Sequence, residues 1–187
     1  MKKNITFFAY MFIIVGSLCS FSNKVILTVA SYEPIYFEQI PEKQKYLNLV
    51  PGQYKNIVLT ISEKLNIPVK IIYNLVQKES NWRESAVGKN RDGSFDVGLT
   101  QINSSNFEYF YWKILKQNVK KDFNYIDFYK NPEVNLWTGF LYLRWLIDYY
   151  NDDVEKALVA YNCGLGKVNR NAIPKSSIQY AKFILTN

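Results

Sequence analysis

The sequence of 187 residues contains no histidine and only two cysteines, Cys19 and Cys163. Without an imidazole the chain cannot form a Ser-His-Asp or Cys-His catalytic arrangement, or any zinc site that includes histidine. Two cysteines are also too few for a four-cysteine metal site or an iron–sulfur cluster. Any catalysis must therefore use carboxylates, hydroxyls, amides or lysines, and we expect neither a metal nor a cofactor.

Residues 1–22 have the layout of a secretory signal. A basic start with Lys2 and Lys3 precedes an apolar run from Ile5 to Leu18, and small residues follow. The run is shorter than the ~20 apolar residues that a membrane span needs, so cleavage is favoured, and a retained anchor is the alternative. We expect export to the periplasm or cell envelope, either free or anchored to the membrane.

The chain carries 23 Lys and Arg against 16 Asp and Glu, a formal net charge of +7. A modest positive balance suits an anionic matrix such as a cell-wall polymer. Beyond the signal the only basic doublet is Lys120-Lys121, and a nucleic-acid interface needs a denser cluster. We therefore expect no nucleic acid as a partner.

Hydrophobic spacing predicts a mainly α single domain over residues 51–187. Residues 23–50 show no sustained periodicity and are expected to form an extended lead-in. Glycines and the turn sequence Asn90-Arg-Asp-Gly93 favour a small hairpin within residues 88–98. Helices are expected over about 54–65, 68–80 and 105–117, from Asn131 with a first-turn proline, after Asp152-Asp153, and from Ser176-Ser177 to about Leu185.

Glu79 is the best candidate for a catalytic group. It shares the apolar face of its predicted helix with Ile72, Leu75 and Val76, and it stands at the helix C-terminus. Burial and the partial negative charge of that terminus both raise the pKa of a carboxyl group. An acid that stays protonated near neutral pH can protonate the leaving oxygen of a glycoside. From the pattern alone, a solvated or lysine-paired glutamate is an equally good interpretation.

Three separated motifs decide between these interpretations: Glu79-Ser80, Gly98–Asn103 and Ala160–Gly164. In order and spacing they resemble the soluble lytic transglycosylase family, which has a goose-type, lysozyme-like helical fold. The resemblance spans roughly residues 53–171. The stretch from Asn90 to Asn103 is most similar to small members that accompany secretion and pilus machines.

The resemblance implies cleavage of the β-1,4 bond between N-acetylmuramic acid and N-acetylglucosamine in peptidoglycan, ending in a 1,6-anhydro ring. Glu79 would act first as the acid and then as the base that takes the proton of the sugar's C6 hydroxyl. The partners implied are peptidoglycan strands and an envelope-spanning secretion, pilus or flagellar machine. The matching positions that would support the site or bind sugar are Ser80, Gln101, Asn103, Tyr161 and Asn162.

Some positions near the motifs have less defined roles. Thr100 stands where the family usually has methionine, which puts the shape of one sugar-contacting wall in question. Cys163 lacks a histidine to activate it and is interpreted as a packing residue. Trp82, Tyr109 and Trp112 are candidates for stacking on sugar rings.

Two alternatives stay open. A hydrolytic goose-type lysozyme would use Asp92 or Asp96 to position a water molecule opposite Glu79. A non-cleaving wall-binding or assembly protein would use the same groove, although a pure binder gains nothing from a desolvated acid.

Overall fold

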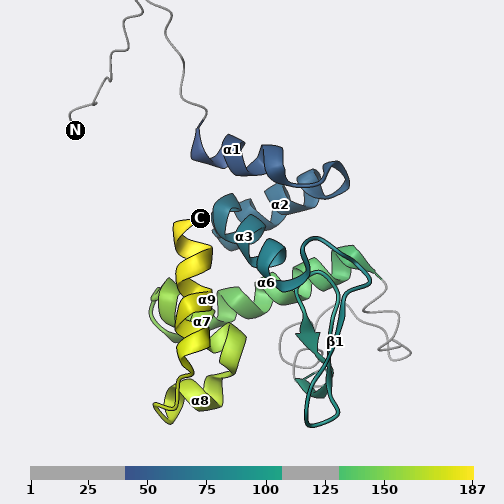
Figure 1. Cartoon of the computed structure of the whole chain (residues 1–187). Helices are drawn as coiled ribbons and strands as arrows, with labels where there is room; N and C mark the ends of the chain where they lie inside the picture. Colours follow the sequence, from purple (N-terminus) through teal and green to yellow (C-terminus); the bar gives the residue numbers. More distant parts are fainter. Residues whose placement is uncertain (1–40, 107–130) are drawn as a thin grey trace, which may run out of the picture. The chain divides into compact units, whose positions relative to one another are not determined.

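The computed structural model describes residues 41–106 and 131–187, which form helices and one small sheet (Figure 1). The expected helix over 105–117 lies outside the described residues beyond Asn106; Ser104–Asn106 form a short 3-10 helix, η2. None of the helices in the described ranges is long and apolar enough to cross a membrane. The predicted mainly α architecture is confirmed.

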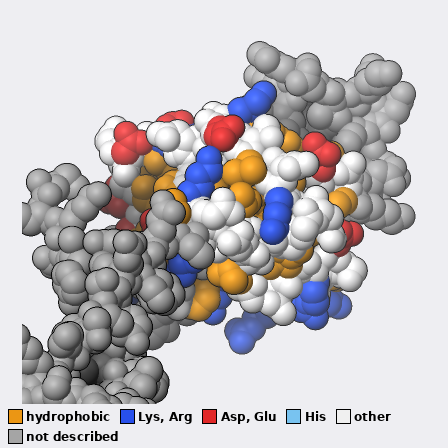
Figure 2. Space-filling view, turned by 90° about the horizontal axis from the view of Figure 1, so that it is seen from above, with side chains coloured by type: hydrophobic (Ala, Val, Ile, Leu, Met, Phe, Trp, Pro, Cys, Tyr) orange, Lys and Arg blue, Asp and Glu red, His pale blue; other side chains and the backbone are white. Residues whose placement is uncertain are grey.

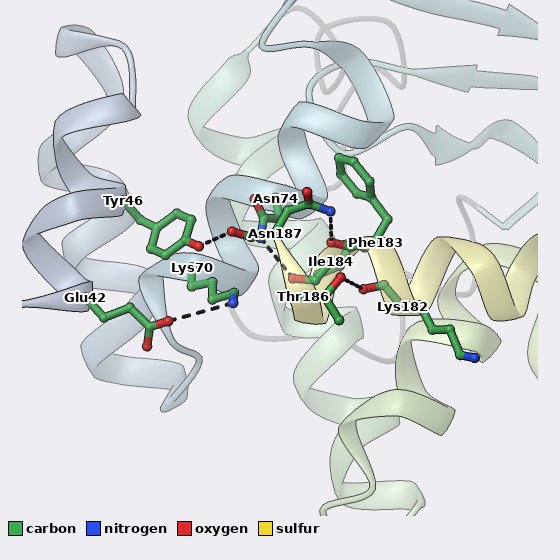
Figure 3. A network of polar contacts seen from close by, with 9 residues as sticks. All are labelled: Glu42, Tyr46, Lys70, Asn74, Lys182, Phe183, Ile184, Thr186 and Asn187. Carbon is green, nitrogen blue, oxygen red and sulfur yellow. Dashed lines mark hydrogen bonds and ion pairs between the residues drawn. The ribbon is translucent and has the colours of Figure 1, made fainter. Parts of the chain in front are cut away.

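Helix α1 (Glu42–Leu49) lies in the stretch where the sequence shows no periodicity. Its one buried side chain, Tyr46, is 3% exposed, and the helix packs against α3. The Tyr46 hydroxyl donates to the backbone carbonyl of Asn187, at the end of α9, as Figure 3 shows. In the same view Nδ2 of Asn74 in α3 donates to the carbonyl of Ile184. These two hydrogen bonds join α1 and α3 to α9.

Helices α2 (Lys55–Leu65) and α3 (Val69–Ser80) meet at the predicted break. A 3-10 turn, η1 (Gly52–Tyr54), precedes α2, which ends where Asn66 takes a left-handed conformation with φ 50°. Pro68 then precedes α3, in agreement with its preference for helix starts. The fully buried side chains of Ile72 and Leu75 fix the orientation of α3. Its last turn carries Glu79.

The predicted hairpin is present. Strands β1 (Val87–Lys89), β2 (Phe95–Val97) and β3 (Ile102–Asn103) form an antiparallel sheet in that order. The amide of Gly93 donates to the carbonyl of Asn90 over 3.1 Å, which closes the predicted turn. Gly98 has φ 80°, and a Cβ there would lie 2.3 Å from Nδ2 of Asn135 on the next helix. Only glycine allows the hairpin to approach that helix so closely.

The other helices are α6 (Pro132–Tyr149), α7 (Val154–Cys163), α8 (Leu165–Asn169) and α9 (Lys175–Thr186). Asn131 and Asp153 cap α6 and α7 as predicted, accepting from the amides three residues later at 3.1 and 2.9 Å. The prediction for α9 is wrong in detail, because the helix begins at Lys175 after Pro174. Ser177 is buried and hydrogen bonds elsewhere instead of capping.

The core lies where α6 and α7 pack together and α9 packs on α7 and α3 (Figure 1). Side chains from all of these helices are fully buried there, among them Leu75, Phe140, Leu143, Leu158 and Ile184. Because α9 contacts both α3 and α7, it joins the helix that carries Glu79 to the helix that carries the third motif.

Candidate active site

A groove of about 590 Å³ opens beside Glu79. It is lined by the end of α3, by polar residues of the hairpin between Asn90 and Asn106, by one face of α6, and by the α7–α8 turn. This volume lies in the range of small-ligand sites. The three motifs, which together span residues 79–164, meet at this groove through Glu79, Gln101, Asn103, Tyr161 and Asn162.

The pKa of Glu79 is raised from 4.5 to about 7, mainly because the carboxyl group is buried. The nearby negative charge of Asp96 raises it further, whereas a hydrogen bond from Tyr180 and the charge of Lys78 lower it. The effect of burial is the larger one, because removing a carboxylate from water costs more free energy than one hydrogen bond provides. Glu79 is therefore largely protonated below neutral pH, and its raised pKa is the direction that its place on the apolar face predicts.

Tyr180 of α9 is a site residue that the sequence analysis missed. It is buried, and its hydroxyl donates to Oε1 of Glu79. Burial, and next the charge of Glu79, raise the pKa of Tyr180 well above its usual value, so it remains a donor at neutral pH. No local pattern distinguishes this tyrosine from a core residue, because the contact joins positions 101 residues apart.

Tyr161 lines the groove and holds the second motif in place. Its hydroxyl donates to the carbonyl of Thr100 over 2.9 Å. The Thr100 side chain itself is fully buried and does not face the groove. Its Oγ1 donates to Oδ1 of Asn135 at 2.8 Å. Threonine at this position therefore fastens the hairpin to α6, and its side chain is not part of the groove wall whose shape the sequence left in question.

Gln101 and Asn103 both line the groove, but their amides are largely occupied by the hairpin. Nε2 of Gln101 donates to the carbonyls of Gly98 and Ala86, at 2.8 and 3.2 Å. Nδ2 of Asn103 donates to Asp96 at 2.8 Å. Both side chains thus set the shape of this wall.

Ser80 and Asn162 lie in different environments. Ser80 is buried, its hydroxyl donates to the carbonyl of Val76 in its own helix, and it does not line the groove. Asn162 is exposed in the groove, and its Oδ1 accepts from Ser177 at 2.7 Å. Its amide nitrogen has no partner among the described residues, so it can donate to a ligand.

The other acids of the groove belong to the hairpin. Oδ1 of Asp92 accepts from the amide and hydroxyl of Ser94, at 2.9 and 2.6 Å, and these bonds lower the pKa of Asp92. Asp96 accepts from Asn103 and acts on Glu79 through its charge. Within the two described ranges, no group of three or more His, Cys, Asp or Glu side chains could hold a metal ion.

The aromatic candidates are placed unevenly. Trp82 stacks on Tyr54, with ring centroids 5.6 Å apart, and does not line the groove. Tyr109 and Trp112 lie outside the described residues. Tyr142 of α6, which the sequence analysis missed, lines the groove with its ring 5.5 Å from that of Tyr161. Cys163 packs against the core as expected and also reaches the groove.

Comparisons with known proteins identify the family of this chain. The family model described as the transglycosylase SLT domain matches residues 56–184. The invasion protein IagB of Salmonella typhimurium is 34% identical over 129 residues, which cover 69% of this chain and 72% of IagB. IagB of Salmonella typhi matches to the same extent.

Two solved structures share the fold. The lytic transglycosylase Slt of Pseudomonas aeruginosa superposes with a TM-score of 0.58 and 17% identity, covering 72% of this chain. The 70 kDa soluble lytic transglycosylase of Escherichia coli gives 0.60 and 20% over 76%. This chain spans about a quarter of their length, 23% and 24%. Family match, identity and fold together show that the chain belongs to the SLT transglycosylase family, the lytic transglycosylases of peptidoglycan.

Proposed function

We propose that Glu79 is the single catalytic acid and base with which this chain cleaves the bond between N-acetylmuramic acid and N-acetylglucosamine. The observation that carries the proposal is a carboxyl group with a pKa of about 7 in a polar groove built by the three motifs. A general acid works best when its pKa lies near the working pH.

The reaction needs no group beyond the substrate and Glu79. The protonated carboxyl gives its proton to the glycosidic oxygen, and the C1–O bond breaks. The muramic acid N-acetyl group stabilises the positive charge at C1. The carboxylate then takes the proton of the C6 hydroxyl, and the bond from this oxygen to C1 closes the 1,6-anhydro ring. Glu79 ends protonated, ready for another cycle.

The other site residues act on Glu79 or on the sugars. Tyr180 holds Oε1 of Glu79 and stabilises the carboxylate that forms midway. The amide nitrogen of Asn162 and the rings of Tyr161 and Tyr142 offer sugar contacts, and Gln101 and Asn103 shape the hairpin wall of the groove. The Pseudomonas aeruginosa structure is that of an inactive mutant in which a glutamate is replaced by glutamine, which supports an essential role for a glutamate.

The test is mass spectrometry of the soluble products from purified peptidoglycan. The chain should release anhydro-muropeptides, and Glu79→Gln should lower the rate by about 100-fold or more while keeping the fold. Glu63→Gln is the matched control, because Glu63 is exposed on α2 and forms an ion pair with Lys43.

Other products would point to other functions. Products heavier by one water would identify a hydrolase and direct attention to Asp96, the groove acid whose charge reaches Glu79. If Glu79→Gln released as much product as the native chain, Glu79 would not be the acid. Binding of peptidoglycan without any product would identify the non-cleaving wall-binding protein.

We also propose that residues 1–22 direct export and that the enzyme works in the envelope, opening the wall for a secretion, pilus or flagellar machine. The support is the signal-like layout together with the identity to a protein named for invasion. N-terminal sequencing of the exported protein tests the first part: a start near Asn23 indicates cleavage, and an intact start in the membrane fraction indicates an anchor.

A further inference from the structure

Polar side chains are buried at only a few places in the described part of the chain, and Ser177 of α9, which is 1% exposed, is one of them. The outer face drawn in Figure 2 differs, because basic, acidic and apolar side chains are interspersed over it. The buried hydroxyls of Ser80 and Thr138 donate to carbonyls of their own helices. The hydroxyl of Ser177 instead donates to Asn162 of α7. Ser177 therefore joins two helices and contacts a residue that lines the groove.

The burial of Ser177 fixes the direction of this hydrogen bond. A buried hydroxyl needs an acceptor for its proton, and among the described residues it has Oδ1 of Asn162, at 2.7 Å. The backbone amide of Ser177 is occupied separately, because it donates to the carbonyl of Pro174 at 3.0 Å. The oxygen of the Asn162 amide is thus turned toward Ser177, and the nitrogen Nδ2 is left to the groove.

Asn162 needs this partner to keep one orientation. Its backbone is fixed in the last turn of α7, where the amide of Gly164 donates to the carbonyl of Ala160 at 2.8 Å. Its side chain, however, is exposed, and the last torsion of an asparagine is broad and roughly two-fold. Without Ser177 the amide would present its oxygen to the groove as well as its nitrogen, so a donor would be available only part of the time.

The same face of α9 also carries Tyr180. Ser177 and Tyr180 are three residues apart, a spacing that places them on one face of a helix. Tyr180 donates to Glu79 of α3, and α9 packs against both α3 and α7 (Figure 1). One turn of α9 thus contacts two groups of the groove, the acid through Tyr180 and the amide of Asn162 through Ser177.

We propose that Ser177 is a positioning residue, which keeps the nitrogen of the Asn162 amide toward the groove so that it donates to an acceptor oxygen of the bound glycan. The proposal rests on the proposed function, because it concerns how Asn162 binds sugar in the same groove. Neither Ser177 nor Asn162 is among the groups that shift the pKa of Glu79. The effect of Ser177 therefore falls on substrate binding and not on proton transfer.

The test is a double-mutant cycle in which KM and kcat are measured from the release of anhydro products by soluble peptidoglycan strands. Ser177→Ala should raise KM about three- to tenfold, the effect expected for one hydrogen bond, and should leave kcat and the alkaline limb of the pH–rate profile in place. Asn162→Ala changes an exposed side chain, which does not endanger folding, and should raise KM to the same extent. Because Ser177 acts through Asn162, the double variant should have the same KM as Asn162→Ala alone.

Two further variants should keep the native KM. Ser177→Thr retains the hydroxyl. Thr186→Ala is the matched control, because it removes a hydroxyl from the other end of α9, where it donates to the carbonyl of Lys182 at 2.8 Å.

The proposal is overturned if Ser177→Ala or Asn162→Ala keeps the native KM. It is also overturned if Ser177→Ala raises KM as much when Asn162 has already been replaced by alanine, since Ser177 would then act by another route. In each of these cases the native chain still releases anhydro products, whereas failure of the proposed function would leave the native chain without them.

Discussion

The pKa of the single residue Glu79 is set by opposing effects of its surroundings. Burial and Asp96 raise its pKa, and Tyr180 and Lys78 lower it, with a balance at about 7. The first step of the proposed reaction needs the protonated form, so the rate should fall as the pH rises through this value. The hydrogen bond from Tyr180 favours the charged form and thereby sets where the fall begins.

Tyr180→Phe tests this balance. Removing the hydroxyl removes an interaction that favours the carboxylate, so the pKa of Glu79 should rise above 7. The alkaline limb of the pH–rate profile should therefore move to higher pH, and kcat should fall because the carboxylate formed midway is less stable.

The control for this variant is Tyr46→Phe, since the Tyr46 hydroxyl bonds to Asn187 and not to the groove. It should leave the pH profile in place. An alkaline limb that stays fixed in Tyr180→Phe, or moves to lower pH, would contradict a role of Tyr180 in setting the pKa of Glu79.

At the scale of elements, the contact between the hairpin and α6 fixes one wall of the groove. Oδ1 of Asn135 accepts from the amide of Thr100 at 2.9 Å, and Nδ2 of Asn135 donates to Val97 at 3.1 Å. Thr100 then packs against Gly139, where a Cβ would lie 2.5 Å from the Cβ of Thr100. The missing side chain of Gly139 is what lets the two elements meet.

Gly139→Ala should therefore destabilise the fold by about 1–3 kcal/mol through overpacking. In an exposed helix the same change would stabilise the fold by up to ~1 kcal/mol. A loss of stability on Gly139→Ala would therefore indicate the close contact with Thr100. Denaturant unfolding measures it, with Gly52→Ala as control because nothing lies within 4 Å of a Cβ there. A Gly139→Ala variant as stable as the native chain would show that the hairpin can move away.

The sequence predicts those elements whose stabilising interactions join residues close together along the chain. Asn131 and Asp153 cap their helices through bonds to amides three residues away, so their patterns are visible in the sequence. Helix α1 buries only Tyr46, which produces no periodic pattern. Its position depends on α3 and on the end of α9, which are distant in the sequence.

The site residues differ in the same way: some depend on local features of the sequence, and others depend on how distant elements pack. Glu79 is predicted because an amphipathic helix and a helix end are local features. Tyr180 is not, since its role depends on how α9 docks beside α3. The motifs indicate Ser80 and Thr100 as site residues, but the sequence does not predict that their side chains are buried away from the groove.

At the scale of the whole molecule, the acid that serves catalysis acts against stability. A carboxyl group whose pKa is higher in the folded than in the unfolded chain binds its proton more tightly when folded. Between pH 4.5 and about 7 the folded chain keeps a proton at Glu79 that the unfolded chain has lost. Each step up in pH across this window therefore favours unfolding, and the effect levels off above it.

Glu79→Gln removes this titration and keeps the shape of the side chain. Relative to the native chain, it should gain stability as the pH rises from about 4.5 to 8, by on the order of 2–3 kcal/mol. Urea unfolding of both proteins at several pH values measures the difference, in which the other carboxylates cancel. Glu63→Gln, at an exposed position, should follow the native curve. If the difference in unfolding free energy between the two proteins did not change with pH, Glu79 would be as well solvated in the folded chain as in the unfolded one. The groove would then lack the protonated acid on which the mechanism depends.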